Sequence, residues 1–376
     1  MDEATYAKAQ QIRWSSEVFR NRVVMRLGEF HVSMAYLACL GSRFGDAGLR
    51  DLLIESDIVA QGSINGVLSG HHYNRSVRTH KLTADALSRL RWLAFLDTLN
   101  DEQRDEIRKI IVDLHENYLS NNILAFVEID EVKMLLQQFQ RFVNIQSAVN
   151  PTFAFWSSYL EMVQLLMLFI RATREGNWEL HLSTVRSMLP WFFACDRVHY
   201  SRYLHVYWLE MKNLRERHPD VHEKLSEGEF VVQRQDQYGF SQIPCDQTIE
   251  QTCNRDTKTK GGLTGFTLNR DAVHRWILSS HERAAITKEC HVMAGKFAQS
   301  RKKDLDRTRS CKDEEHTKSV MATVGSMINP FEPGRQELVN ISSGVVAPDN
   351  VCTDLLSAEE LGEIAVKAYC KETAEG

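Results

Sequence analysis

The stretch from Pro244 to Gly262, with the sequence PCDQTIEQTCNRDTKTKGG, contains the residues best suited to chemistry. A proline starts it, a glycine pair ends it, and residues 245–253 between them fit a short helix. At helical spacing Asp246, Glu250 and Asn254 fall on one face, four residues apart each time. Such a stripe of two acids and an amide can hold a divalent metal or a polar substrate.

Two functions for these carboxylates are open. In the first, Asp246 and Glu250 bind Mg²⁺ or Mn²⁺, whose preferred ligands are carboxylate oxygens. In the second, Asp246 caps the N-terminus of the helix that follows Pro244, and Glu250 faces water. In both cases Ile249 and Cys253 are expected to point towards a core.

A second candidate lies in the motif PWFFACDRVHYSRYL, residues 190–204. Asp196 and His199 are three residues apart and could hydrogen-bond, which would orient the imidazole for catalysis. The alternative is a packed helix with a satisfied histidine, since an aromatic stripe at helical spacing usually belongs to a core. The stripe consists of Tyr200, Tyr203 and Tyr207.

Two basic groups could contact phosphate. Lys258 and Lys260 stand beside a flexible glycine pair, although the segment does not match a phosphate-binding loop of the GxxxxGK[ST] type. Arg75, Arg78 and Lys81 follow a tandem histidine and suit a nucleic-acid backbone if they gather on one surface. A solvated helix face explains the second group equally well.

The hydrophobic pattern predicts a mostly α fold with a small β component. Strands are expected at Arg22–Leu27, before the turn Gly28–His31 with its carboxylate Glu29, and at Phe230–Arg234. Helices are expected at 82–99, 153–173, 179–188, 196–214 and 270–297, the second of them buried on nearly every side. A capping box at 357–360 predicts a last helix, with its buried face at Leu361, Ile364, Ala365 and Ala368.

The chain has 376 residues and a net charge of −5, so it has no overall attraction to nucleic acid or to anionic membranes. Its cysteines are scattered singly, and the acidic start is no secretory signal, which indicates an intracellular protein. The longest apolar run, near residues 163–170, is too short to span a bilayer, so no membrane contact is expected.

Four motifs in order carry a resemblance to a known family: GEFHVSMAYLACLGSRFGDAGL, PWFFACDRVHYSRYL, DQTIEQTCNRDTKTKGGLTGFTL and NPFEPGRQELVNISSG. From about Arg22 to the C-terminus, the chain resembles uncharacterised proteins that are repeated many times in invertebrate genomes and derive from transposable elements. These proteins look like diverged relatives of transposases with an RNase H-like core.

The resemblance implies a fold and a chemistry. It implies an incomplete RNase H-like α/β core interrupted by a large helical insertion, with Glu250 as the late acid, Asp246 beside it and the first aspartate on a strand upstream of Met1. It divides the chain into a partial core element at 1–45, a helical insertion at 46–215, a return to the core at 216–298, and a charged linker, loop and C-terminal helix at 299–376. Mg²⁺ or Mn²⁺ would be the cofactor, and DNA a possible partner.

Two hypotheses follow. The first is a transposase remnant with weak or no strand-transfer or nuclease activity, which would be located in the nucleus. The second is a non-enzymatic helical module that binds a protein partner, which would be located in the cytoplasm, with structural roles for the acids. The four motifs favour an origin from a transposase. Since the chain offers no candidate for the first catalytic aspartate, the non-enzymatic module is favoured as its present activity. The oligomeric state stays open.

Overall fold

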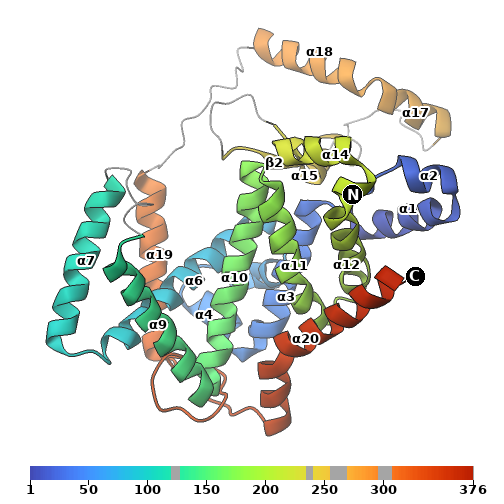
Figure 1. Cartoon of the computed structure of the whole chain (residues 1–376). Coiled ribbons are helices and arrows are strands. Elements are labelled where there is room, and N and C mark those ends of the chain that lie inside the picture. Colours follow the sequence, from blue (N-terminus) through green and yellow to red (C-terminus); the bar gives the residue numbers. More distant parts are fainter. Residues whose placement is uncertain (120–127, 234–239, 255–268, 295–306, 376) are drawn as a thin grey trace.

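The computed structural model describes residues 1–119, 128–233, 240–254, 269–294 and 307–375. It is mostly helical, with one small sheet, as the sequence predicts (Figure 1). The N-terminal half contains α1 (Glu3–Ser15), α2 (Glu17–Arg22), α3 (Glu29–Phe44), α4 (Leu49–Glu55), α5 (Ile64–Leu68), α6 (Tyr73–Leu96), α7 (Asp101–Leu119), α9 (Asp130–Val149) and α10 (Pro151–Glu175).

The C-terminal half begins with α11 (Trp178–Ala194), α12 (Val198–Lys212), α13 (Leu214–Arg217) and α14 (Pro219–Lys224). There follow β1 (Val231–Val232), β2 (Ile243–Pro244) and α15 (Cys245–Ile249), which continues as a π-helical turn at Glu250–Asn254. The last elements are α17 (Arg270–Leu278), α18 (Ser280–Met293), α19 (Arg307–Ser326) and α20 (Asp349–Glu375).

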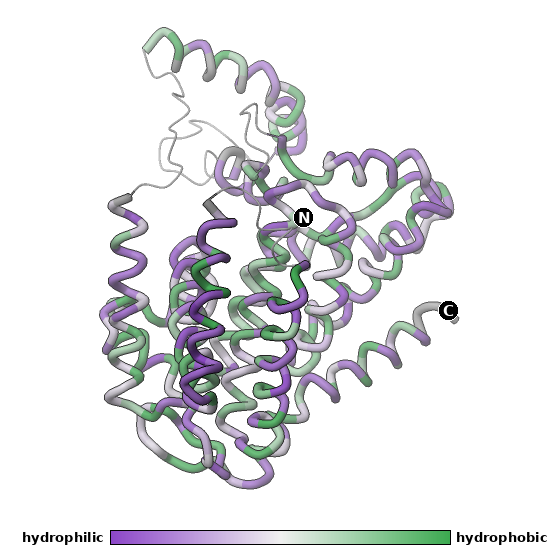
Figure 2. The backbone as a smooth tube through the Cα atoms, turned by 60° about the vertical axis from the view of Figure 1, so that its left-hand side comes forward, coloured by the Kyte–Doolittle hydropathy of each residue, from purple (hydrophilic) through white to green (hydrophobic). Residues whose placement is uncertain are grey.

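The helix α10 is the centre of the bundle and packs against α3, α6, α9 and α11 (Figure 1). Asn150 caps its start by accepting a hydrogen bond from the backbone of Phe153, and Gly176 ends it in the left-handed conformation. Its aromatic side chains Phe153, Trp156 and others are fully buried, which confirms the predicted interior helix. In Figure 2 hydrophobic segments gather along the inner helices, whereas hydrophilic residues dominate the outlying ones.

By length and composition α10 could also cross a membrane, which the shorter run at 163–170 did not indicate. More than half of the apolar stretch is buried inside the bundle, however. A core helix of a large helical protein has this composition because it packs against neighbours on every side. We therefore attribute the apolarity of α10 to its central position.

One continuous buried cluster runs from Tyr6 to Val366 and draws on all four predicted segments of the chain. The strands β1 and β2 pair antiparallel, Val231 opposite Pro244, which confirms the predicted strand near Phe230 in shortened form. The predicted strand at Arg22–Leu27 is wrong, because Arg22 ends α2 and residues 23–27 lie outside the sheet found among the described residues. Instead Met1 donates to the carbonyl of Arg26 and accepts from the amide of Gly28, at 3.3 and 2.7 Å.

Three predicted helix boundaries are also wrong. Pro190 lies inside α11 rather than after it, and the helix expected at 270–297 divides at Ser279. The helix α20 begins at Asp349, so Ser357 is an interior residue, and its hydroxyl donates to the carbonyl of Thr353 at 2.7 Å. The packing of a helix against the rest of the bundle overrides these local signals.

The helix α20 packs closely on α11 through Gly362. A Cβ at this position would lie 2.2 Å from the carbonyl oxygen of Pro190, so only glycine admits the approach. On this helix Val366 is buried, whereas Leu361 and Ile364, predicted on its buried face, are 55% and 57% exposed.

We expect opposite effects from the same substitution in two helices. Gly362→Ala will destabilise the protein because the new methyl group collides with the Pro190 carbonyl. Gly325→Ala in α19, where a Cβ meets nothing within 4 Å, will be neutral or will stabilise by up to about 1 kcal/mol through helix propensity. Chemical denaturation of both variants checks this, and a stable Gly362→Ala protein would contradict the packing described.

Candidate functional site

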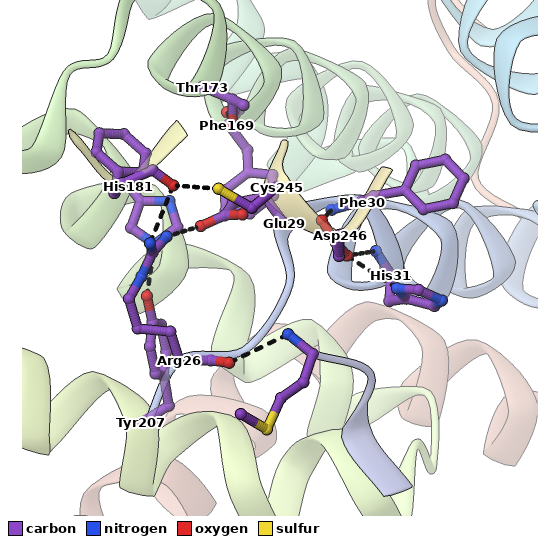
Figure 3. A network of polar contacts seen from close by, with 12 residues as sticks. Arg26, Glu29, Phe30, His31, Phe169, Thr173, His181, Tyr207, Cys245 and Asp246 are labelled. Atoms are coloured by element: carbon purple, nitrogen blue, oxygen red, sulfur yellow. Dashed lines mark hydrogen bonds and ion pairs between the residues drawn. The ribbon is translucent and has the colours of Figure 1, made fainter. Parts of the chain in front are cut away.

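Polar residues gather where α15 meets the N-terminal end of α3 (Figure 3). The elements that form this region are the extended link at 23–28, the first turn of α3, the paired strands β1 and β2, and α15, which follows β2 directly. The antiparallel pairing of β1 and β2 fixes the start of α15 against the bundle. Asp246, the first candidate residue, lies on this short helix.

Asp246 caps α3, a helix far away in the sequence. Its Oδ1 accepts from the backbone N–H of Phe30 at 3.2 Å, and its Oδ2 accepts from the backbone N–H of His31 at 3.1 Å. The Nδ1–H of His31 donates to the same Oδ2 at 2.8 Å. The carboxylate thus satisfies amides that a helix start leaves without partners, and it lies at the positive end of the helix dipole.

Gly28, the N-cap residue of α3, makes this contact possible. It has no side chain to cap the helix, and a Cβ here would lie 2.0 Å from Oδ2 of Asp246. The space that a serine or aspartate normally fills at an N-cap is therefore occupied by a carboxylate from another element. The expectation that Asp246 caps its own helix is wrong, because its side chain reaches α3 instead.

Asp246 and His31 shift each other's pKa values. Burial alone would raise the pKa of Asp246, but the hydrogen bonds from His31 and Phe30 hold it below its usual value. The bond to Asp246 is the main cause that raises the pKa of His31, and the charge of Glu250 adds to it. Asp246 is therefore ionised at neutral pH, and His31 favours its protonated form.

A second acid, Glu29, is buried in the same turn and forms an ion pair with Arg26. Arg26 also donates to the carbonyl of Phe230 at 2.9 Å, and its guanidinium lies over the rings of Trp178 and Phe230. Burial raises the pKa of Glu29, as does the charge of Asp246, whereas Arg26 opposes the shift. The two neighbouring acids thus have pKa values displaced in opposite directions.

A buried imidazole lies on the far side of Arg26. The Nε2 of His181 is 3.0 Å from the hydroxyl of Tyr207, and its ring stacks on Trp178. Burial, together with the charge of Arg26, lowers the pKa of His181 to about 3, so this histidine is neutral. Beside it, Cys245 donates its thiol to the carbonyl of Phe230 at 3.4 Å.

Glu250 lies one turn after Asp246, and its Oε1 accepts from the side-chain amide of Asn254 at 2.7 Å. Of the predicted stripe, Glu250 and Asn254 thus lie side by side, whereas the carboxylate of Asp246 faces α3, and Ile249 is 51% exposed rather than in a core. The side chain of Cys253 lies outside the described residues. Within the described ranges, no group of three or more His, Cys, Asp or Glu residues is placed to hold a metal. Metal binding by Asp246 and Glu250 stays a prediction.

Asp196 and His199 are not brought together. Asp196 follows the end of α11 with a positive φ of 50°, and its amide donates to the carbonyl of Phe193 at 3.1 Å. His199 is exposed, and its Nδ1 lies 3.6 Å from Oε1 of Glu3. The stripe of Tyr200, Tyr203 and Tyr207 packs in the core. The aromatic stripe thus follows the structural alternative considered for it, whereas His199 is exposed rather than satisfied within a core.

The basic residues of α6 have structural contacts. Arg75 donates to the hydroxyl of Ser63 at 2.9 Å, and Nε of Arg78 donates to Asp313 of α19 at 3.0 Å, while Lys81 is exposed. Lys258 and Lys260 lie outside the described residues. Nucleic-acid binding by all five residues stays a prediction.

A cavity of about 360 Å³ lies next to Asp246, between α3, α6 and α15. Neither Asp246 nor Glu29 contributes to its lining, which consists of Phe30, His72, Tyr73, Asn74, Arg75, Gln247 and Gln251. The sequence did not indicate this cavity. Nor did it identify Arg26, although a charged residue within the apolar run VVMRL requires a carboxylate once it is buried.

The interaction of His31 with Asp246 predicts that the stability of the protein depends on pH. A raised pKa of His31 means that its contribution to stability is fully present below about pH 6.5 and is lost as the pH rises through the higher folded value. We expect the free energy of unfolding to fall between about pH 6.5 and 8 in the wild type, and to fall less in His31→Gln. Denaturant titrations across this range provide the measurement.

The control is His199→Gln, which removes an exposed histidine from α12. It should leave the slope of the wild type unchanged. The buried residues His80, His181 and His205 have lowered pKa values, so their effect lies below pH 6.5 and does not disturb this interval. An equal slope in His31→Gln and the wild type would refute the coupling.

The chain was compared with known families, curated proteins and solved structures. Residues 1–375 match a family described as Domain of unknown function (DUF8702). No curated protein and no solved structure matches the chain. Since the match extends over nearly the whole sequence, the chain belongs to the DUF8702 family.

Proposed function

We propose that this protein is a non-enzymatic helical module that binds another protein, and that Asp246 and Glu250 have structural roles. The observation that supports the proposal most directly is the cap of α3. Both carboxylate oxygens of Asp246 accept N–H groups, and Oδ2 accepts two of them. An acid in this position holds the fold together.

Metal-dependent phosphodiester hydrolysis would require a different arrangement of these carboxylates. Two-metal sites use several carboxylates whose oxygens are free to face a pair of ions. For Asp246 to act in this way, the amides of Phe30 and His31 would lose their partner at the buried start of α3. An unsatisfied buried amide costs roughly 1–3 kcal/mol, which disfavours the exchange.

The helices α7 and α9 offer a surface for a protein partner. The apolar face of α7 continues beyond what the bundle covers: Ile107 is buried, whereas Ile111 and Tyr118 are 44% and 62% exposed. On α9, Met134 and Ile145 are 57% and 52% exposed. Apolar side chains in such number on adjacent helices are typical of an interface.

We take the partner to be a second copy of this chain. A two-fold interface places the same patch on both subunits, so its flanks must be complementary to themselves. The flanks of this surface carry both signs, with exposed acids and bases on each helix. On α7 these are Asp105, Glu106, Arg108 and Lys109, and on α9 they are Asp130, Glu131, Lys133 and Arg141.

A second candidate function is the transposase remnant. Asp246 and Glu250 both raise the pKa of His31, so each acid lies within electrostatic reach of the same imidazole. In that function the two acids would bind Mg²⁺ or Mn²⁺ as the sequence predicts, and DNA would be the substrate. One pair of variants separates the two functions.

Asp246→Asn and Glu250→Gln should differ in stability. We expect Asp246→Asn to lower the free energy of unfolding by about 1–2 kcal/mol, the usual cost of a lost cap, and Glu250→Gln to change it by less than about 0.5 kcal/mol. Titration calorimetry with Mn²⁺ should detect no uptake by the wild type or by either variant. Uptake by the wild type that both substitutions abolish would support the catalytic function instead.

Self-association tests the interaction surface. Met134→Glu places a charge in the middle of the exposed face of α9 and should weaken a dimer, as seen in the concentration dependence of the sedimentation coefficient. Leu361→Glu is the matched control, since Leu361 is 55% exposed on α20, away from this surface. A wild type that sediments as a monomer at every concentration would exclude a second copy as the partner.

A further inference from the structure

We propose that a cavity between the N-terminal helices and the end of α12 binds a small phosphate-bearing ligand with a flat aromatic ring, of the nucleotide class. The cavity has a volume of about 470 Å³, within the usual range for small-molecule sites. Arg13, Trp14 and Arg20 line it from α1 and α2, and Glu210, Arg217 and His218 line it from α12 and the segment after it. The proposed protein–protein interaction does not involve these residues.

The acid in the wall is already neutralised. Glu210 forms an ion pair with Arg13, and its Oε2 accepts from the side-chain amide of Gln10 at 3.0 Å. Nε of Arg13 donates to Oε1 of Gln10 at 2.7 Å, which closes a buried triad. The single negative charge of Glu210 is thus matched by Arg13, and the other two arginines of the lining add positive charge to the cavity.

Two guanidinium groups are left without a counter-charge. Among the described residues, neither Arg20 nor Arg217 forms an ion pair, although both line the cavity. Nη2 of Arg20 donates to the carbonyl of Trp14 at 2.8 Å, which holds this group at the cavity wall. Burial chiefly lowers the pKa of Arg13, and the charges of Arg217 and Arg20 lower it further, so the three groups act on one another.

This arrangement selects a compact anion. Like charges around a shared space repel one another, and a phosphate relieves the repulsion while accepting paired hydrogen bonds from arginine. The net charge of the whole chain is −5, so the cavity is positive against the general trend of the molecule. The positive charge is thus local to the cavity.

The aromatic part of the ligand follows from Trp14. Its indole is 42% exposed and lines the cavity beside the apolar residues Val24, Met211 and Leu214. A nucleobase that stacks on an aromatic side chain gains roughly 1–3 kcal/mol. Phosphate contacts at one wall and a flat ring at another together describe a nucleoside phosphate rather than a free inorganic anion.

Calorimetry with adenosine monophosphate tests the site on the full chain. We expect the wild type to bind it, and Arg20→Gln and Arg217→Gln each to weaken binding by about tenfold or more, the effect of losing a charge-assisted hydrogen bond. The matched controls are Arg22→Gln and Arg215→Gln, which remove exposed arginines nearby that do not line the cavity. Both controls should bind like the wild type.

Two further probes separate the phosphate from the ring. Adenosine should bind far more weakly than adenosine monophosphate, and Trp14→Leu should weaken binding of the nucleotide while leaving that of inorganic phosphate unchanged. Phosphate binding that equals nucleotide binding would overturn the assignment of the ring. No binding of adenosine monophosphate, or equal losses in the control and cavity variants, would overturn the site itself.

Discussion

The carboxylate of Asp246 at the start of α3 is the interaction on which this end of the molecule depends. It joins α15 to a helix that begins more than two hundred residues earlier, and it does so with N–H donors from Phe30 and His31. Because Gly28 has no side chain, the carboxylate can reach those amides at all. The pairing of β1 with β2 then fixes where α15 lies.

Each buried acid near this cap is paired with a cation. Asp246 is balanced by His31, and Glu29 by Arg26, so each buried acid has its own cation. Charges removed from water are tolerated only when they are paired and hydrogen-bonded, and this end of the bundle meets that condition. The cavity lined by Arg20 and Arg217 does not, since its acid is used by Arg13. The contrast separates charges that hold the fold together from charges available to a ligand.

Local pattern predicted the helices well and their contacts poorly. The composition of α10 identified an interior helix, and the spacing correctly placed Glu250 beside Asn254. That Asp246 caps α3 could not be read from the sequence, because the amides it binds belong to a distant segment. Likewise, the approach of α20 to α11 at Gly362 is a property of two packed helices rather than of either one, so the sequence did not indicate that Leu361 would be exposed.

The cap of α3 has a consequence for synthesis in the cell. His31 and Asp246 are 215 residues apart, and a ribosome adds about 5–20 residues each second, so the helix waits roughly 10–40 s for its cap to be translated. During that interval its first amides are satisfied only by water, and its apolar face has no α10 or α11 to cover it for much of the time. The start of α3 thus obtains its native hydrogen-bond partner only after most of the chain has been translated.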